Sequence, residues 1–179
     1  MSVIKHFVDG KNYEGSSKRT SKVFNPATGE NISNVILASK VDVDFSVNKA
    51  KNAFYEWSNK PPIIRARVLF KYKEILEKNS DLLTKLIVNE HGKVYEDAKG
   101  SLKRGLEVVE FACGIPQLLK GEFTENVGTD VDSWSTRQAL GVCAGITPFN
   151  FPAMVPMWMF PIAIACGNTF ILKPSEKDP

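Results

Sequence analysis

The sequence predicts an α/β fold in which a layer of helices precedes the start of a parallel sheet. Residues 42–113 contain four segments whose apolar side chains recur at helical spacing, so each segment has one face to bury. Residues 141–146 and 169–172 have the apolar character of buried strands, and an apolar segment long enough for a helix separates them. Both strands run into polar residues. Because ligands bind beyond the carboxyl ends of parallel strands, we expect one shared site there.

The first forty residues predict short strands separated by turns. Residues 4–8 alternate apolar and polar side chains, and Asp9 and Gly10 follow as a hairpin-type turn. Residues 22–24 predict a second strand, which the turn sequence NPATG at residues 25–29 ends. Residues 34–37 predict a third strand before the helices begin.

The helical layer is expected to begin at Asp42 and to end near residue 113. Pro61 and Pro62 separate the first two helices, Ser80 or Asp81 caps the third, and Gly92 ends it. The fourth helix is expected over residues 95–113. The predicted buried stripes are Val47, Ala50, Ala53, Phe54 and Trp57; Ile64, Val68, Leu69, Tyr72, Ile75 and Leu76; Leu82, Leu83, Leu86 and Ile87; and Leu102, Leu106, Val109 and Cys113. The exposed face of the second helix is expected to carry Arg65, Lys71, Lys73 and Glu74.

The region between the helices and the apolar run predicts one further strand. Residues 129–140 alternate in polarity and are expected to be extended up to the start of the run. No charged residue occurs over residues 138–172, a length that would cross a membrane. Four prolines in that run would interrupt a spanning helix, so we expect no membrane span: Pro148, Pro152, Pro156 and Pro161.

The composition is typical of a globular protein without nucleic-acid partners. The net charge is only +3, and the lysines are scattered along the chain, as for a solvated surface. Three widely spaced cysteines in apolar surroundings indicate free thiols in a reducing compartment. Residues 1–15 show neither a signal core nor an arginine-rich amphipathic run, so we expect a cytoplasmic location.

The usual glycine-rich nucleotide motifs do not occur, so a dinucleotide site would have to use other groups. Lys173, just past the second buried strand, could donate to ribose hydroxyls, and Glu176 could accept from them. Alternatively, the Lys-Pro-Ser-Glu sequence ends the strand and caps a following helix through Ser175. The spacing alone favours this alternative.

Asn150 is the second candidate for a functional residue. Its amide, held between Pro148 and Pro152, could donate to an oxygen that becomes negative in a tetrahedral intermediate. The alternative is an asparagine that satisfies the backbone of its own turn. The cysteines lack neighbours in sequence that would lower a thiol pKa, so packing roles are favoured. His6 and His91 are isolated and make no metal pair, so we expect surface or capping roles and no metal site.

The segments ITPFNFP at residues 146–152 and FILKPSE at 170–176, with an apolar helix between them, resemble the aldehyde dehydrogenase superfamily. The resemblance extends over the whole chain and includes the NPATG turn. Within the superfamily, three features resemble the coenzyme A-acylating methylmalonate-semialdehyde or malonate-semialdehyde dehydrogenases. These are Phe149, where most members have tryptophan, the run over residues 154–176, and the segment KRGLEVVEFACGIP around Arg104.

The resemblance implies roles for the residues that match its motifs. Asn150 would stabilise the oxyanion, and Arg104 would hold the substrate carboxylate, for which a planar guanidinium is suited. Without the resemblance, Arg104 is a solvated helix residue. The residues implied in binding NAD are Ile146, Thr147, Pro148 and Phe149, as a main-chain wall on the nicotinamide side, and Lys173 and Glu176, at the adenosine ribose, with Ser175 beside them.

The resemblance also implies a division of the chain and a reaction. Residues 1–121 would be the N-terminal part of the NAD-binding domain, 122–140 part of an oligomerisation hairpin, and 141–179 an incomplete start of a Rossmann-like NAD-binding core. The parent enzyme would be a homotetramer or homodimer. It would oxidise a small semialdehyde with NAD through a cysteine thioester and pass the acyl group to coenzyme A.

Family members are longer, and their nucleophilic cysteine lies in a Gly-Gln-x-Cys type motif that neither Cys143 nor Cys166 matches. We therefore expect a truncated chain, an N-terminal fragment that is inactive alone. Two alternatives stay open: a fragment of an ordinary acid-forming aldehyde dehydrogenase, and a non-catalytic stub or assembly partner.

Overall fold

The structure, a computed structural model, describes residues 2–179 and begins with five short strands. Two sheets result: β1, β5 and β4 lie side by side in that order, and β2 and β3 form a separate hairpin. The strands are β1 (Ser2–Ile4), β2 (His6–Val8), β3 (Lys11–Tyr13), β4 (Thr20–Phe24) and β5 (Asn31–Ile36). The single strand predicted over residues 4–8 is wrong, because the chain leaves one sheet at Lys5 and enters the other. The predicted turn is confirmed, since Asp9 and Gly10 both have positive φ, at 56° and 74°.

Five helices follow; the first four lie close to the predicted ranges, the fifth was not predicted, and Asn79 rather than Ser80 or Asp81 is the N-cap of the third. They are α1 (Lys40–Asn59), α2 (Pro62–Lys78), α3 (Ser80–His91), α4 (Tyr95–Cys113) and the short α5 (Ile115–Leu118). The first helix begins two residues before Asp42, because Ser39 is its N-cap and Asp42 completes a capping box with it. Asp42 is almost fully buried, and its Oδ1 accepts hydrogen bonds from Tyr13 Oη and the main-chain N–H of Ser16.

The predicted inward faces are right for α4 and partly wrong for the other helices. In α4, Leu102, Val109 and Cys113 are buried as predicted. Arg65, predicted on the exposed face of α2, is 5% exposed, because it reaches the carboxyl end of a helix far along the chain, where its Nε donates to Ala165 O over 3.0 Å. Several predicted core residues are exposed instead, namely Val47, Ala53, Ile64, Val68, Ile75, Leu82 and Leu86.

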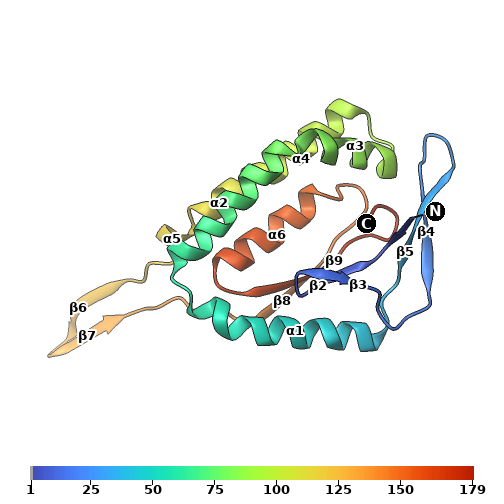
Figure 1. Ribbon diagram of the computed structural model, residues 1–179. Coiled ribbons are helices and arrows are strands. Elements are labelled where there is room, and N and C mark those ends of the chain that lie inside the picture. Colours follow the sequence, from blue (N-terminus) through green and yellow to red (C-terminus); the bar gives the residue numbers. More distant parts are fainter. Residues whose placement is uncertain (1) are drawn as a thin grey trace.

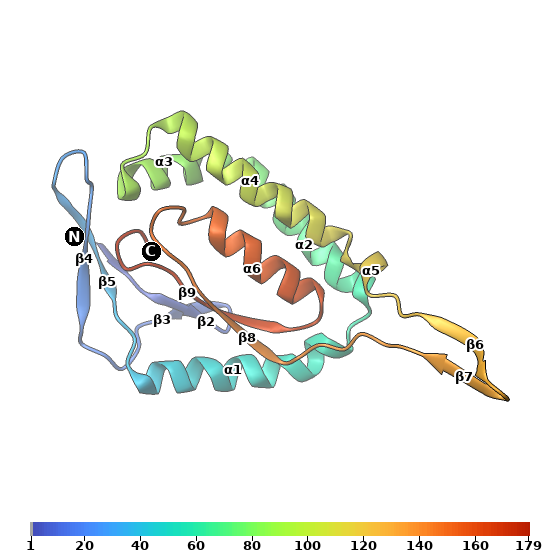
Figure 2. The same cartoon turned by 180° about the vertical axis from the view of Figure 1, so that it is seen from behind.

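A two-stranded hairpin projects from the body of the molecule (Figures 1 and 2). It consists of β6 (Phe123–Gly128) and β7 (Val131–Trp134), paired antiparallel, and every side chain in both strands is exposed. The continuous strand predicted over residues 129–140 is therefore wrong. Of the predicted range only β7 is a strand, and it pairs with β6, which the polarity pattern did not predict. Residues 135–140 lie outside any sheet and lead back to the body of the molecule.

The last part of the chain forms the expected parallel unit. It comprises β8 (Val142–Ile146), α6 (Met154–Ala165) and β9 (Thr169–Lys173), and the two strands pair in parallel with Ile146 opposite Lys173. In Figure 1, α6 lies on one face of this strand pair and α1 on the other, while α2 and α4 cover the outer side of α6. This order of layers confirms the α/β prediction.

Close packing between α4 and α6 depends on Gly105. A Cβ at that position would lie 3.3 Å from Met154 Cα and still closer to the end of the Met157 side chain. The prolines do not prevent helix α6, since Pro156 lies in its first turn and Pro161 within it. None of the helices formed by residues 2–179 is long and apolar enough to span a membrane.

Candidate functional site

The carboxyl ends of β8 and β9 lie side by side, as the sequence predicted. The main-chain N–H of Thr147, one residue past β8, donates to Lys173 O at the end of β9 over 3.1 Å. Parallel pairing of the two strands places residues 147–152 and 173–176 at one edge of the sheet.

The segment after β9 carries an exposed ion pair. Lys173 Nζ lies 3.3 Å from Glu176 Oε2, and both side chains are about half exposed. A hydrogen bond from its own main-chain N–H, together with Lys173, lowers the pKa of Glu176, which is therefore ionised at neutral pH. Ser175 is buried, and its Oγ accepts from the main-chain N–H of Lys177 over 3.0 Å. Ser175 thus fixes a turn in the main chain; no helix follows it within residues 2–179.

The turn after β8 exposes Asn150 and buries Thr147. Within residues 2–179 no hydrogen bond holds the side-chain amide of Asn150, so the amide is available to a ligand. Thr147 Oγ1 is buried and has no hydrogen-bond partner in the described chain. Phe149 is flanked by the His91 ring, whose centroid lies 6.4 Å away, and by Lys177 Nζ, 4.3 Å from the ring centroid.

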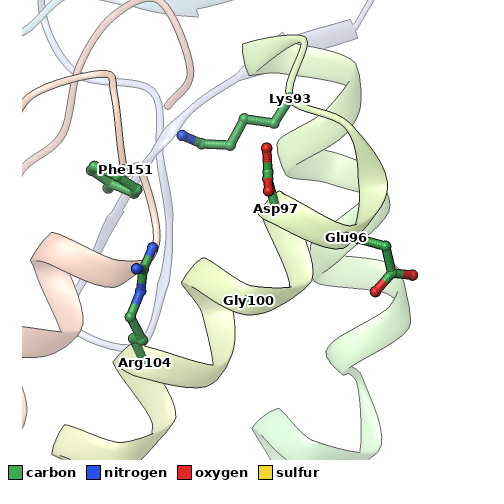
Figure 3. A pocket seen from close by; sticks show the side chains of 6 residues that line it. All are labelled: Lys93, Glu96, Asp97, Gly100, Arg104 and Phe151. Carbon is green, nitrogen blue, oxygen red and sulfur yellow. The ribbon is translucent and has the colours of Figure 1, made fainter.

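A pocket of about 330 Å³ separates this turn from helix α4 (Figure 3). Its lining consists of Lys93, Glu96, Asp97, Gly100, Arg104 and Phe151. Figure 3 shows Lys93 and Arg104 approaching Phe151 from opposite ends of the pocket, while Glu96 points away from it. Lys93 Nζ lies 4.1 Å and Arg104 Cζ 5.5 Å from the centroid of the Phe151 ring.

Arg104 and the Asn150 turn, predicted independently from the sequence, therefore border one pocket. Neither Lys93 nor Arg104 forms an ion pair with a carboxylate of residues 2–179. Arg104, a cation beside an aromatic ring and without an anionic partner in the described chain, suits a ligand carboxylate. The Lys93 ammonium donates instead to the main-chain carbonyl of Asn150. The sequence analysis missed Lys93, whose only signal is its place directly after Gly92, the residue that ends α3.

The three cysteines lie away from this pocket lining. Cys113 is buried, its Sγ donates to Val109 O over 3.4 Å, and burial raises the pKa of its thiol. Burial also raises the pKa of Cys166 at the end of α6. Cys143, in β8, is half-buried. No three His, Cys, Asp or Glu residues gather as metal ligands in the part of the chain that the structure describes.

Asp178 is a buried acid that the sequence analysis did not identify. It is 3% exposed, and burial, together with the nearby Glu90, raises the pKa of its carboxyl to about 6. Burial likewise raises the pKa of Glu90, near the end of α3.

The sequence model of the aldehyde dehydrogenase family matches residues 13–179. The chain therefore belongs to this family, as its motifs indicated. It is 54% identical over 179 residues to the malonate-semialdehyde dehydrogenase of Pseudomonas aeruginosa and covers 36% of that protein. It is also 50% identical over 176 residues to the mitochondrial, acylating methylmalonate-semialdehyde dehydrogenase of Arabidopsis thaliana. That match covers 98% of this chain and 29% of the Arabidopsis protein.

Solved structures show the same fold. All of this chain superposes on 36% of a candidate methylmalonate-semialdehyde dehydrogenase from Sinorhizobium meliloti 1021, solved in complex with NAD, with a TM-score of 0.98 and 54% identity. The methylmalonate-semialdehyde dehydrogenase of Oceanimonas doudoroffii gives a TM-score of 0.97, also at 54% identity, with the same coverage of both chains. The chain thus has the predicted aldehyde dehydrogenase architecture and spans about a third of the length of these relatives.

Proposed function

We propose that these residues form part of an NAD-dependent, coenzyme A-acylating dehydrogenase for malonate semialdehyde or methylmalonate semialdehyde. The observation that carries the proposal is the pocket that Arg104 shares with the Asn150 turn. In this pocket the Arg104 guanidinium faces Phe151, the residue that follows Asn150 in the turn. The names of the similar proteins support this substrate class.

Arg104 would bind the substrate through its carboxylate. The guanidinium is exposed at the pocket and is not paired with an acid of the described chain, so it can form two parallel hydrogen bonds to a carboxylate. This contact would orient the aldehyde group and favour semialdehydes that carry an acid group over uncharged aldehydes.

Asn150 would stabilise the oxyanion. When a thiolate adds to the aldehyde carbon, the carbonyl oxygen becomes negative, and an amide N–H already directed at that oxygen stabilises the addition. Loss of such a donor costs about 3–4 kcal/mol in the transition state. The unengaged amide of Asn150 fits this role better than that of an asparagine satisfying its own turn.

The edge formed by β8 and β9 fits the cofactor NAD, which, when bound, would accept a hydride. Lys173 and Glu176 are exposed enough to exchange their ion pair for contacts to ribose hydroxyls, and Ser175 holds the turn between them. The main chain of Ile146, Thr147, Pro148 and Phe149 would form the wall on the nicotinamide side. The buried, unpartnered Thr147 Oγ1 is a polar atom that this wall could offer to a ligand.

None of the three cysteines of this chain suits the role of the nucleophile. Burial raises the pKa of Cys113 and Cys166, which disfavours the reactive thiolate, and Cys143 lies within strand β8. We therefore expect purified residues 1–179 to form no NADH from malonate semialdehyde, NAD and coenzyme A. NADH formation by that chain would contradict the assignment.

The function can be tested on the protein expressed at its natural length. With malonate semialdehyde and NAD, we expect coenzyme A to be required for turnover and the product to be the acyl thioester. A free acid formed equally well without coenzyme A would indicate an acid-forming dehydrogenase instead. Absence of NADH formation with every aldehyde would contradict the proposal.

The role of Arg104 is tested in the same assay. The variant Arg104→Gln should lose about 10- to 100-fold in kcat/KM for malonate semialdehyde, the usual worth of a charged hydrogen bond. The kcat/KM of this variant for propanal, which has no carboxylate, should change little. The neighbouring exposed variant Lys103→Gln is the matched control. Equal losses with both aldehydes would refute a carboxylate-binding role.

A further inference from the structure

The segment that joins α3 to α4 supports the turn that carries Asn150. Lys93 Nζ donates to the main-chain carbonyl of Asn150 over 2.7 Å, and the same ammonium lies 4.1 Å from the centroid of the Phe151 ring. Two residues earlier, at the last position of α3, the His91 ring stacks on Phe149 with an interplanar angle of 28°. Three consecutive residues of the turn are thus contacted from one short segment.

Lys93 is itself held in place by the fold. Gly92, just before it, adopts the left-handed conformation at φ 83° that ends helix α3. A Cβ on Gly92 would lie 2.7 Å from Pro26 Cγ, so the NPATG turn presses directly against the main chain at this point. The Lys93 side chain therefore starts from a fixed position.

The contact fixes the peptide group that Asn150 shares with Phe151. A hydrogen bond from an ammonium to a carbonyl is stronger than one between neutral groups, and the aromatic face attracts the same charge. Because the amide of Asn150 is not held by any other group in residues 2–179, its direction depends on the main chain that bears it. A group that fixes this main chain therefore fixes the Cα–Cβ bond from which the donor projects.

We infer that Lys93 is a positioning residue that aims the Asn150 amide at the developing oxyanion. The inference rests on the proposed function, in which Asn150 is the oxyanion donor. It assigns Lys93 no contact with the substrate: Lys93 acts on the rate through the Asn150 main chain, and Arg104 binds the substrate carboxylate at the other end of the pocket.

The test compares Lys93→Met, which keeps the length of the side chain and removes its charge, with the conservative variant Lys93→Arg. The control is Lys99→Met, since Lys99 is an exposed lysine of α4 whose Nζ lies 6.0 Å from the Tyr95 ring, away from the turn. Each variant, in the protein at its natural length, is measured for the rate of the first turnover, the Kd of NAD and amide hydrogen exchange at Val155 and Met157, whose N–H groups donate to Phe151 O and Ala153 O of the turn.

For Lys93→Met we expect the first-turnover rate to fall about tenfold, which corresponds to about 1.4 kcal/mol. The Kd of NAD should stay within twofold, and hydrogen exchange should quicken at Val155 and Met157 and not in β8 or β9. Lys93→Arg should recover most of the rate, and Lys99→Met should match the parent protein in every measurement.

An unchanged first-turnover rate in Lys93→Met would overturn the inference, whatever happens to hydrogen exchange. So would a loss accompanied by faster exchange throughout the chain, because that result describes general destabilisation. If the parent protein forms no NADH at all, the proposed function fails. The exchange measurement then still decides whether Lys93 holds the turn.

Discussion

The side chain of Asn150 can be changed with little effect on the fold, because it is exposed and its amide is unengaged within residues 2–179. We therefore expect Asn150→Ala to lower turnover by about 10²- to 10³-fold while the Kd of NAD and the thermal midpoint stay unchanged. Asn52→Ala, at an exposed position in α1, is the control. Similar losses of turnover and NAD affinity would count against an oxyanion role.

Asp178 should make stability depend on pH. Its carboxyl has a pKa of about 6 in the folded chain against an ordinary value of 3.8, so the folded state binds the proton more tightly than the unfolded state. The stabilisation this provides is full below about pH 4 and is lost as the pH rises through about 6. Other acids also titrate in this range, so the relevant quantity is the difference in thermal midpoint between the parent protein and Asp178→Asn, measured from pH 4 to 7.5. A difference that does not vary with pH would exclude this linkage.

At the level of single residues, the motifs identified in the sequence account for the roles proposed for Asn150, Arg104 and Lys173. In the structure Arg104 lines a pocket together with Phe151, the residue after Asn150. The inward position of Arg65 could not be predicted, because a helical pattern places an arginine on the polar face. Its actual partner, the carbonyl of Ala165, is 100 residues away in sequence. Lys93 escaped prediction for the same reason: its contact to Asn150 spans 57 residues.

Among the elements, the end of α3 is the most sensitive to a small change. Gly92→Ala would force a side chain into a positive φ and against Pro26, so we expect the free energy of unfolding to fall by about 1–3 kcal/mol. Gly100→Ala, in α4, meets open space and should be neutral or slightly stabilising, by at most about 1 kcal/mol. Denaturant unfolding of both variants and of the parent protein measures the change in the free energy of unfolding. Equal effects of the two substitutions would contradict the assigned strain.

The projecting hairpin is the element most suited to contact another chain. Its exposed apolar side chains, Phe123, Val127, Val131 and Trp134, are each more than half exposed and belong to strands without a covering layer. We propose, as the family resemblance implies, that the hairpin contacts a second copy. Trp134→Ser should then lower the molar mass measured by light scattering at the natural length. Tyr55→Ser, at an exposed aromatic position in α1, should leave that mass unchanged, and an unchanged mass in Trp134→Ser would argue against the hairpin.

The elements themselves differed in how well the sequence predicted them. Helix α4 has its predicted bounds, because a sustained apolar stripe marks it. The polarity pattern did not predict the β6–β7 hairpin, because neither strand buries a face and no alternation between buried and exposed positions constrains its sequence. Only the family resemblance implied a hairpin within residues 122–140. In α2 the predicted buried face differs from the observed one, because three apolar residues that the pattern placed on it are exposed: Ile64, Val68 and Ile75.

For the whole molecule, the α/β class and the meeting of the two strand ends followed from the sequence, since buried parallel strands carry a strong apolar signal. The order in which the layers stack could not be predicted from the sequence. That α1 rather than α2 covers the second face of β8 and β9 depends on contacts between residues far apart in the chain. Trp57 Nε1, for example, donates to Ile164 O over 2.9 Å, across 107 residues.

The anchoring of the carboxyl end of α6 by Trp57 and Arg65 also bears on how the chain folds as it is synthesised. Arg65 leaves the ribosome 100 residues before Ala165, whose carbonyl it binds. Until then the guanidinium can bind only its nearby partners, the carbonyls of Ser58 and Lys60, and the groove that will receive α6 stays open to water. Docking of this helix is therefore a late event that closes several long loops at once, and the nascent chain exposes apolar surface while it waits.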